Sequence, residues 1–336
     1  MKSKLFSIIT TLVITVTFAQ QKLIAIKGTT TDAIATTLTE AITLAQPNDK
    51  IYLPGGNFDF TGIIDKPIHI IGVGFQNGLN IDGTTQINGD LTINANGNNS
   101  TFEGFYLSGN FICLTNGEVN NLLFKRLNIS GVGGINYFGW TNCVFVNCVV
   151  RSTLDFSSSN NSTNIVISNS FINRVSRLQN SLINNCIVGS SNSIISCSNS
   201  TIKNCIFSGF DIYNNTNGNA ISYGSSGLNF YNNAVAASLG EGVISDLNTI
   251  IINNISEVFV NASNYIFNPT FDTQLLSSFA GNNAGDDGTD VGIYGGQYPW
   301  KNGSLPISPN IEQNNSFLDV QNEQFKLRVK VVPQTN

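Results

Sequence analysis

The chain has 336 residues and a formal net charge of −5, and only 11% of its residues are charged. Ordinary soluble proteins carry about 25% charged residues, so Asn, Ser and Thr supply most of the surface polarity, which favours an extracellular protein. The acidic balance excludes a nucleic-acid-binding face, because such a face needs clustered Lys and Arg.

The first 19 residues have the pattern of a secretory signal peptide. Lys2 and Lys4 precede an apolar run from Leu5 to Val16, and Ala19 is the small residue before the predicted cleavage point. The apolar run is too short to span a bilayer, and no other stretch is long enough. The sequence therefore predicts a secreted protein, periplasmic or extracellular, with no membrane span.

Residues 20–50 are predicted to contain a short strand and a helix. Thr31 or Asp32 is placed to cap that helix. A repeat array follows at 51–280, and the open apolar end of such an array must be covered, so we expect the helix to be its N-terminal cap. One helix face is formed by four apolar residues at steps of four, four and three: Ile34, Leu38, Ile42 and Ala45.

One phrase recurs eight times between residues 99 and 254. It contains an asparagine slot, then an apolar residue, and then a second slot five positions after the first. Asn fills seven of the eight first slots, although only 49 of the 336 residues are Asn. The second slot returns at steps of 16 to 28 residues, a period typical of solenoids. The first slots are Asn99, Asn121, Asn142, Asn164, Asn180, Asn199, Gly227 and Asn248, and the second slots are Gly104, Arg126, Asn147, Asn169, Asn185, Asn204, Asn232 and Asn253.

Apolar and polar residues alternate within each phrase, which predicts short β-strands. Each phrase is then one coil, stacked on the next at about 4.8 Å. Amide side chains at that spacing can hydrogen-bond to the amides above and below and to turn backbone. Asn also tolerates the left-handed backbone of a sharp corner. The sequence therefore predicts ladders of asparagines along the coil corners.

The phrasing resembles the coils of right-handed parallel β-helix proteins of the pectin-lyase-like superfamily, of the exported bacterial type. The strings that carry the resemblance are Asn147-Cys148, Asn185-Cys186 and Asn204-Cys205, together with opening coils from residue 46 and a closing turn at 282–296. The resemblance implies an all-β single-stranded parallel β-helix and a polysaccharide ligand. Two sets of catalytic strings known in the superfamily are absent, namely Gly-His-Gly with Arg-Ile-Lys and a Trp-Ile-Asp-His-like string, and the single His69 lies in an apolar strand.

The six cysteines divide into two groups. Three of them follow the second asparagine slot directly, so they form one column, where free Cys behaves as a small buried apolar residue; these are Cys148, Cys186 and Cys205. A disulfide among the other three, Cys113, Cys143 and Cys197, stays open.

Arg151 and Arg174 lie four and five residues after Asn147 and Asn169 on consecutive coils, and Arg177 follows a few residues later. Guanidinium groups along one edge, with Asp155 as the single acid nearby, are suited to bind an anion such as a uronate carboxylate. In the alternative interpretation these arginines occupy solvated coil corners. The two same-slot residues Glu103 and Lys125 are expected to form a surface ion pair.

Three aspartates of the predicted closing turn, Asp286, Asp287 and Asp290, are candidate calcium ligands, because carboxylates closely spaced around Gly suit a hard cation. In the alternative interpretation Asp290 accepts backbone amides in the turn. No other cofactor is indicated.

The predicted organisation is a signal peptide at 1–19, a strand and capping helix at 20–50, a β-helix at 51–280, and a closing turn with a C-terminal capping tail at 281–336. Two functions stay open. The first is a secreted carbohydrate-binding or surface-adhesion protein whose partner is a polysaccharide or cell-surface glycan. The second is an enzyme acting on an acidic glycan, a polysaccharide lyase rather than a glycoside hydrolase. Convergent catalytic groups in a pocket would favour the enzyme.

Overall fold

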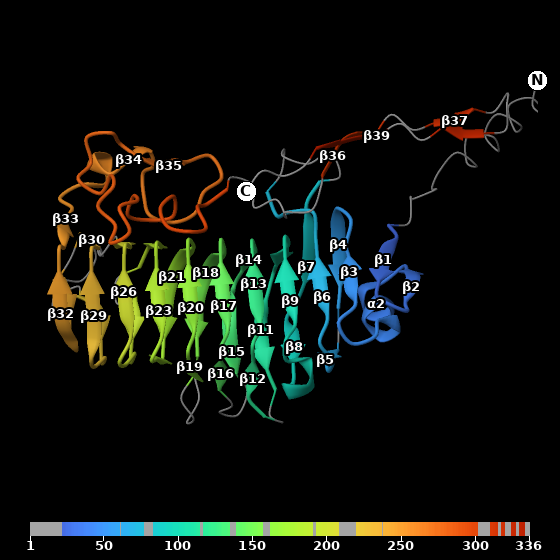
Figure 1. Ribbon diagram of the computed structural model, residues 1–336, viewed down its shortest axis with the longest axis horizontal. Helices are drawn as coiled ribbons and strands as arrows, with labels where there is room; N and C mark the ends of the chain where they lie inside the picture. Colours follow the sequence, from blue (N-terminus) through green and yellow to red (C-terminus); the bar gives the residue numbers. More distant parts are fainter. Residues whose placement is uncertain are drawn as a thin grey trace, which may run out of the picture.

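The computed structural model describes residues 22–60, 62–76, 83–114, 117–134, 139–156, 162–190, 193–207, 220–236 and 238–301, and four short strands beyond them. The predicted signal peptide lies outside the described residues. The chain winds into a right-handed parallel β-helix whose axis runs the length of the molecule (Figure 1). The predicted fold class is confirmed.

Sheet A, with twelve strands, forms one face of the β-helix. Each coil adds one strand of mostly three residues, paired in parallel with the strands of the coils before and after it. Two antiparallel strands close its N-terminal end. The strands in spatial order are β2 (Asp32–Ala35), β1 (Ile24–Lys27), β3 (Lys50–Tyr52), β6 (His69–Ile71), β9 (Thr101–Glu103), β13 (Leu123–Lys125), β17 (Val144–Val146), β20 (Val166–Ser168), β23 (Leu182–Asn184), β26 (Thr201–Lys203), β29 (Leu228–Tyr231) and β32 (Val243–Leu247).

Sheet B, with seventeen strands, contains two parallel runs on either side of a bend. The long strands β18 (Val149–Asp155) and β21 (Phe171–Ser176) continue through the bend and join the runs. The first run also contains β4 (Gly56–Asp59), β7 (Thr85–Asn88), β10 (Tyr106–Leu107), β14 (Asn128–Ile129), β24 (Ile187–Val188), β27 (Ile206–Phe207), β30 (Ala234–Val235) and β33 (Ile250–Ile251). The second run also contains β5 (Ile63–Ile64), β8 (Leu91–Ile93), β11 (Asn110–Cys113), β15 (Gly131–Gly134), β25 (Ile194–Ile195), β28 (Ala220–Tyr223) and β31 (Ser238–Gly240).

The remaining elements are small. Sheet C contains β12 (Val119–Asn120), β16 (Trp140–Thr141), β19 (Ser162–Thr163) and β22 (Leu178–Gln179). Three antiparallel pairs follow the coils: β34 (Phe259–Asn261) with β35 (Asp272–Leu275), β36 (Asn310–Asn314) with β39 (Val329–Val332), and β37 (Phe317–Asp319) with β38 (Gln324–Lys326). Two 3-10 turns, η1 (Ala95–Gly97) and η2 (Ile255–Glu257), complete the described structure with the helix α2 (Leu38–Leu44).

Both asparagine slots are left-handed corners that flank the sheet A strands. The first-slot residues have φ between 46° and 67°, and the second-slot residues from Gly104 to Asn232 have φ between 47° and 73°. Asn and Gly adopt this conformation at lower cost than other residues. The repeat in the sequence is therefore a repeat of sharp turns, which hold each sheet A strand to three or four residues over most of the array.

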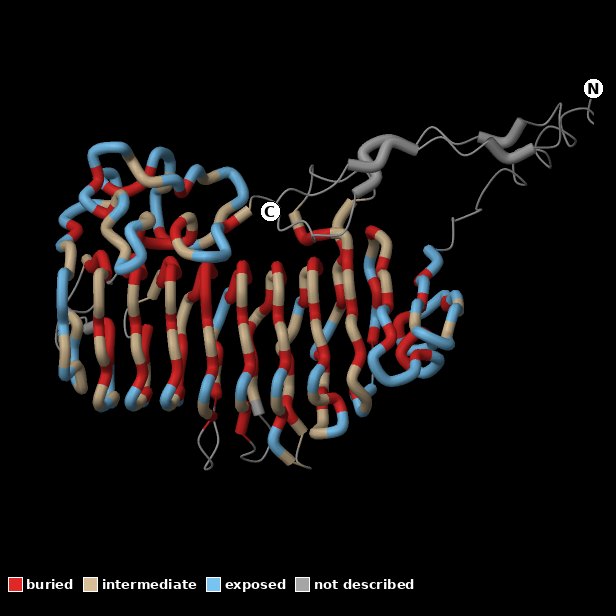
Figure 2. Tube along the Cα trace, viewed as in Figure 1, coloured by how far each residue is buried: buried red, intermediate tan, exposed pale blue. Residues whose placement is uncertain are grey.

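The core is a column of aromatic and aliphatic side chains inside the coils. Buried residues recur along the successive coils (Figure 2). Phe124 and Phe145 stack with ring centroids 4.4 Å apart and planes 5° apart, close to the spacing of adjacent strands. All six cysteines are buried free thiols. The column of Cys148, Cys186 and Cys205 is confirmed, and no disulfide joins the other three.

The N-terminal helix is shorter than predicted. Residues 32–35 form β2, which pairs with β1 and leaves Ile34 63% exposed. The helix begins only after Thr37, whose hydroxyl accepts a hydrogen bond from the Glu40 amide, while the Glu40 carboxylate accepts one from the Thr36 amide. This reciprocal pair is a capping arrangement, and it overrides the apolar spacing that suggested an earlier start.

The last parallel strand ends at Ile251, whereas the sequence-based boundary of the β-helix was residue 280. Residues 252–301, which we call the C-terminal loop, fold back over the corner between sheets A and B (orange in Figure 1). They lie along the side of the later coils. The predicted C-terminal tail contains the separate strands β38 and β39.

Candidate functional site

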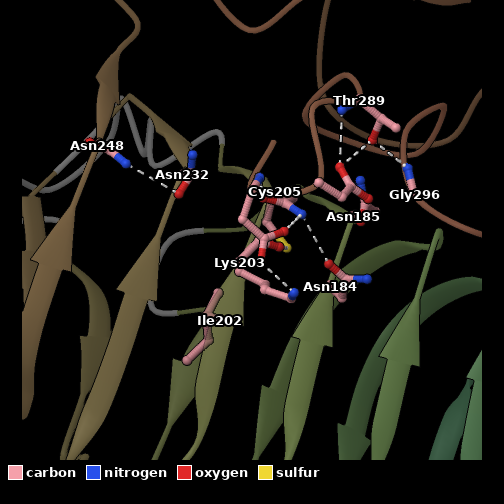
Figure 3. A network of polar contacts seen from close by, with 12 residues as sticks. Asn184, Asn185, Ile202, Lys203, Cys205, Asn232, Asn248, Thr289 and Gly296 are labelled. Atoms are coloured by element: carbon pink, nitrogen blue, oxygen red, sulfur yellow. Dashed lines mark hydrogen bonds and ion pairs between the residues drawn. The ribbon is translucent and has the colours of Figure 1, made fainter. Parts of the chain in front are cut away.

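The C-terminal loop is anchored on the second-slot asparagines, which we call the inner asparagine column. Asn169, fully buried, donates to the Ile293 and Gly295 carbonyls at 2.9 and 2.7 Å. Asn147 donates to the Tyr298 carbonyl at 2.8 Å, and Asn232 donates to the Ala284 carbonyl at 2.8 Å. Asn185 donates to the Asp290 and Gly292 carbonyls of the same loop, and Asn204 donates to Asp286 Oδ1. Figure 3 shows Asn185 beside the loop residues Thr289 and Gly296.

This arrangement corrects the predicted ladder. In the exposed first slot, Asn121 donates to Asn99 at 2.6 Å and Asn164 donates to Asn142 at 3.2 Å, as predicted. In the inner column most amides donate to the loop, while Asn147 also donates to the Asn169 carbonyl at 3.5 Å, the predicted contact with turn backbone. The close approach of the loop to the inner asparagine column requires glycine. A Cβ on Gly295 would lie 1.8 Å from the Asp290 carbonyl oxygen.

The loop covers an outward-facing apolar row of sheet B. Phe171, Ile187 and Ile206, whose direction the sequence left open, are at most 4% exposed and belong to a second apolar cluster with loop residues. Phe171 packs edge-to-face on Trp300 and on Phe267, with centroids 5.2 Å apart in both pairs. These side chains therefore point out of the coils and are buried by the loop.

A pocket of about 490 Å³ opens where the loop stops covering this row. We call it the aromatic pocket. In register with Phe171, the same row continues as Val149, then Asn128, then Tyr106, so it becomes polar at the pocket. The lining residues fall into an aromatic and apolar set, with Phe75, Tyr106, Val149, Phe171, Tyr265 and Phe267, and a polar set, with Gln76, Asn128, Arg151 and Asn173.

Arg151 is the sequence-predicted residue that lines this pocket. Its guanidinium carbon lies 4.5 Å from the centroid of the Tyr106 ring, and its Nη2 donates to the Leu107 carbonyl at 2.6 Å. Those two residues belong to the coil two turns earlier, so the Arg151 side chain runs along the axis past the intervening coil. A cation–π contact with the ring together with a backbone anchor holds the guanidinium in place.

Two buried polar atoms of pocket-lining residues have no hydrogen-bond partner in the described structure, Asn128 Oδ1 and Tyr265 Oη. Burial raises the pKa of Tyr265 to about 12, and the Glu257 carboxylate adds to the shift, so this phenol keeps its proton at neutral pH. Buried polar groups almost always find a partner. A pocket that presents an unsatisfied acceptor and an unsatisfied hydroxyl is suited to a ligand rich in hydroxyl groups.

The other predicted residues lie elsewhere. Arg177 forms an ion pair with Asp155, with its Nη2 2.8 Å from Oδ2 and its Nε 3.0 Å from Oδ1. Arg174 lies next to Thr153 in the second run of sheet B and does not line the aromatic pocket, and its buried Nε has no partner in the described structure. The three arginines therefore do not form one edge.

The three aspartates of the closing turn are each engaged by neighbouring groups. Asp286 accepts from Lys203 and from Asn204; these bonds and the lysine charge lower its pKa and outweigh the opposing effect of burial. Asp287 accepts from Thr289, and Asp290 accepts the Asn283 amide at 2.9 Å, as the alternative interpretation held. Within the described residues, no group of three or more acidic, His or Cys side chains is arranged to hold a metal ion. Calcium binding by this loop stays a prediction.

The prediction of an ion pair between Glu103 and Lys125 is wrong. Although these residues are in register, Glu103 pairs with Arg126 at 2.8 Å, and the two side chains are only 13% and 10% exposed. Arg126 occupies the second slot of its coil, so its side chain lies in the space beside sheet A. Without it, the buried carboxylate of Glu103 would be unpaired, which is energetically costly.

The stacked parallel strands and the inner asparagine column define a right-handed parallel β-helix. No protein-family model and no curated protein sequence matches this chain. Among solved structures, it is similar to that reported as "Crystal structure of pectate lyase Pel9A", with 11% sequence identity, a TM-score of 0.36, and coverage of 77% of this chain and 91% of that chain. Among the described residues there is no helix with the length and apolar character of a membrane span.

Proposed function

We propose that the protein is an exported glycan-binding protein and that the aromatic pocket holds the sugar. The observation that carries the proposal is the combination, in one pocket, of an arginine in cation–π contact with two buried polar atoms that lack partners in the described structure. Aromatic faces pack against the apolar faces of sugar rings, and amide and guanidinium groups hydrogen-bond to hydroxyls.

Binding is favoured over catalysis at this pocket by the chemistry of its lining. Among the residues that the structure describes, the lining includes no Asp, Glu, His or Lys. Hydrolysis by the usual route needs two carboxylates, and proton abstraction needs a base within hydrogen-bond reach of the proton. The alternative function, a polysaccharide lyase acting on an acidic glycan, predicts unsaturated uronate products that absorb in the ultraviolet.

The test is retention of the purified mature chain on a glycan array, with absorbance followed in the same samples. We expect retention without new absorbance. Arg151→Gln should weaken binding about 10- to 150-fold, the loss expected for charge-assisted hydrogen bonds. Arg177→Gln, which removes the same charge outside the pocket, is the matched control. Equal binding by the two variants would refute the assignment, and new absorbance would establish the lyase.

Export is a separate part of the proposal. The predicted cleavage after Ala19 would release a chain that begins at Gln20. N-terminal sequencing of the protein recovered from the periplasm or medium of a bacterial host checks it, because retention of Met1 would show that the segment is not removed.

A further inference from the structure

A second concave site lies on the outer face of sheet A, on the other side of the inner asparagine column. We call this 670 Å³ space the sheet A groove. Its floor is formed by outward-facing side chains of four consecutive strands, β13, β17, β20 and β23. Its wall is the end of the C-terminal loop, residues 297–301, which Asn147 holds by its bond to the Tyr298 carbonyl.

The floor is largely apolar. It includes Leu123, Val144, Val146, Val166 and Leu182, and these side chains are only partly buried. Four coils at about 4.8 Å each give the floor a length of roughly 15 Å, which suits a small ligand or one short segment of a longer one. An apolar floor by itself does not define a ligand.

The polar end of the groove defines the class of ligand. Lys125, Arg126 and Lys301 line it, and no carboxylate of the described part of the chain does. Arg126 is the second-slot residue of its coil, in the left-handed conformation at φ 51° where other coils carry Asn or Gly. Its side chain is 10% exposed, and only Nη1 is engaged in the ion pair with Glu103.

The Nε of Arg126 is buried without a partner in the described structure. A guanidinium presents a fork of donors that matches a carboxylate, and Glu103 is bonded at Nη1, away from the Nε edge. Lys301 contributes to the same positive field. Its pKa is lowered, first by burial and then by the charge of Arg126, so like charges face one another across this end of the groove.

We propose that the sheet A groove binds a carboxylate group carried on an uncharged, partly apolar body, with Arg126 Nε and Lys301 receiving the carboxylate. The body lies over the aliphatic floor. Two sources share this chemistry, a sugar acid and an aliphatic organic acid. The site is independent of the aromatic pocket, since the two share no lining residue.

The test is NMR of the mature protein with labelled Leu and Val methyl groups, titrated separately with glucuronate, hexanoate and glucose. Val146 and Val166 report on the groove, while Val149 and Val150 report on the aromatic pocket. Single Val→Ile variants assign each signal. We expect carboxylates to shift the groove signals and glucose to leave them unchanged.

Two variants remove the charge. Glu103→Gln/Arg126→Asn replaces the buried ion pair with neutral groups and restores the corner residue of other coils, and Lys301→Gln leaves that pair intact. Each should weaken carboxylate binding about tenfold or more, whereas Lys50→Gln, on the more distant strand β3, should change it less than twofold. Unchanged methyl signals elsewhere show that a variant is folded.

Each outcome decides the proposal. Shifts with glucuronate alone support a sugar acid as the ligand, and shifts with hexanoate support an organic acid. Groove shifts with glucose equal to those with glucuronate would overturn the proposal, as would no shift with either carboxylate or wild-type binding by Lys301→Gln. Because Val149 and Val150 are read in the same spectra, a failure of the aromatic pocket is visible separately.

Discussion

Replacing Asn169 tests whether the inner asparagine column holds the C-terminal loop. Asn169→Gly keeps the left-handed corner without backbone strain, so its effect reports on the side chain alone. The fully buried amide donates to two loop carbonyls, and its Oδ1 accepts from the Ser168 hydroxyl at 2.7 Å. The variant removes all three hydrogen bonds and leaves the two carbonyls buried.

The expected loss is about 2–4 kcal/mol in the free energy of unfolding. Each neutral hydrogen bond contributes about 0.5–1.5 kcal/mol, and a buried partner left unsatisfied costs about 1–3 kcal/mol. Some relief comes from water that enters the small space left by the amide. The matched control is Asn164→Gly, a corner with the same conformation whose amide makes one exposed hydrogen bond, and it should cost less than about 1 kcal/mol.

The assay is urea unfolding of both variants beside the wild type, with limited proteolysis of the folded proteins. Asn169→Gly should lower the urea midpoint and expose the C-terminal loop to early cleavage, whereas Asn164→Gly should do neither. Equal midpoints and equal cleavage in the two variants would refute the view that the inner column anchors the loop.

Four further predictions follow from the same structure. Burial raises the pKa of the Cys143 and Cys148 thiols from 9.0 to about 12, so the neutral thiol is favoured in the folded state, and stability should fall as pH rises from about 9 toward 12; replacing both by Ala should make that fall shallower in pH-dependent urea unfolding, while the other buried thiols keep part of it. Glu103→Gln strands a buried guanidinium and should lower stability by about 2–4 kcal/mol, with part of the loss recovered in Glu103→Gln/Arg126→Asn, as measured by thermal unfolding. Thr37→Ala removes the helix cap and should cost about 1 kcal/mol, whereas a midpoint equal to that of the wild type would show that β2 alone fixes the start of α2. If the closing turn binds calcium, the metal should raise the melting temperature of the wild type and not of Asp287→Asn, and removal by a chelator should reverse the gain.

The coils were predictable from sequence because their determinants are local. A left-handed corner favours Asn or Gly at a fixed position, so this preference is visible as a repeat. Arg151 was also accessible, because a cation is conspicuous in a chain with 11% charged residues. The path of the C-terminal loop was not predictable from sequence. Its anchoring hydrogen bonds join residues 52 to 151 positions apart, and most of the acceptors are backbone carbonyls, which every residue type carries.

Tyr106 and Asn128 were missed for a related reason, although a signal for them exists. They occupy the slot that later coils fill with Phe171, Ile187 and Ile206. The change from polar to apolar along one column marks where the loop begins to cover the sheet. It also marks where the aromatic pocket opens, so reading the repeat column by column would have located the pocket.

The anchoring of the loop couples its length to the number of coils. Each of five successive coils contributes one inner-column amide to the loop, from Asn147 to Asn232. Successive anchor points along the loop therefore contact successive coils of the array. Duplicating or deleting a coil within this span, the usual way in which repeat arrays change length, would displace every later anchor by one step. Growth of the array is free of that constraint only on the N-terminal side of Asn147.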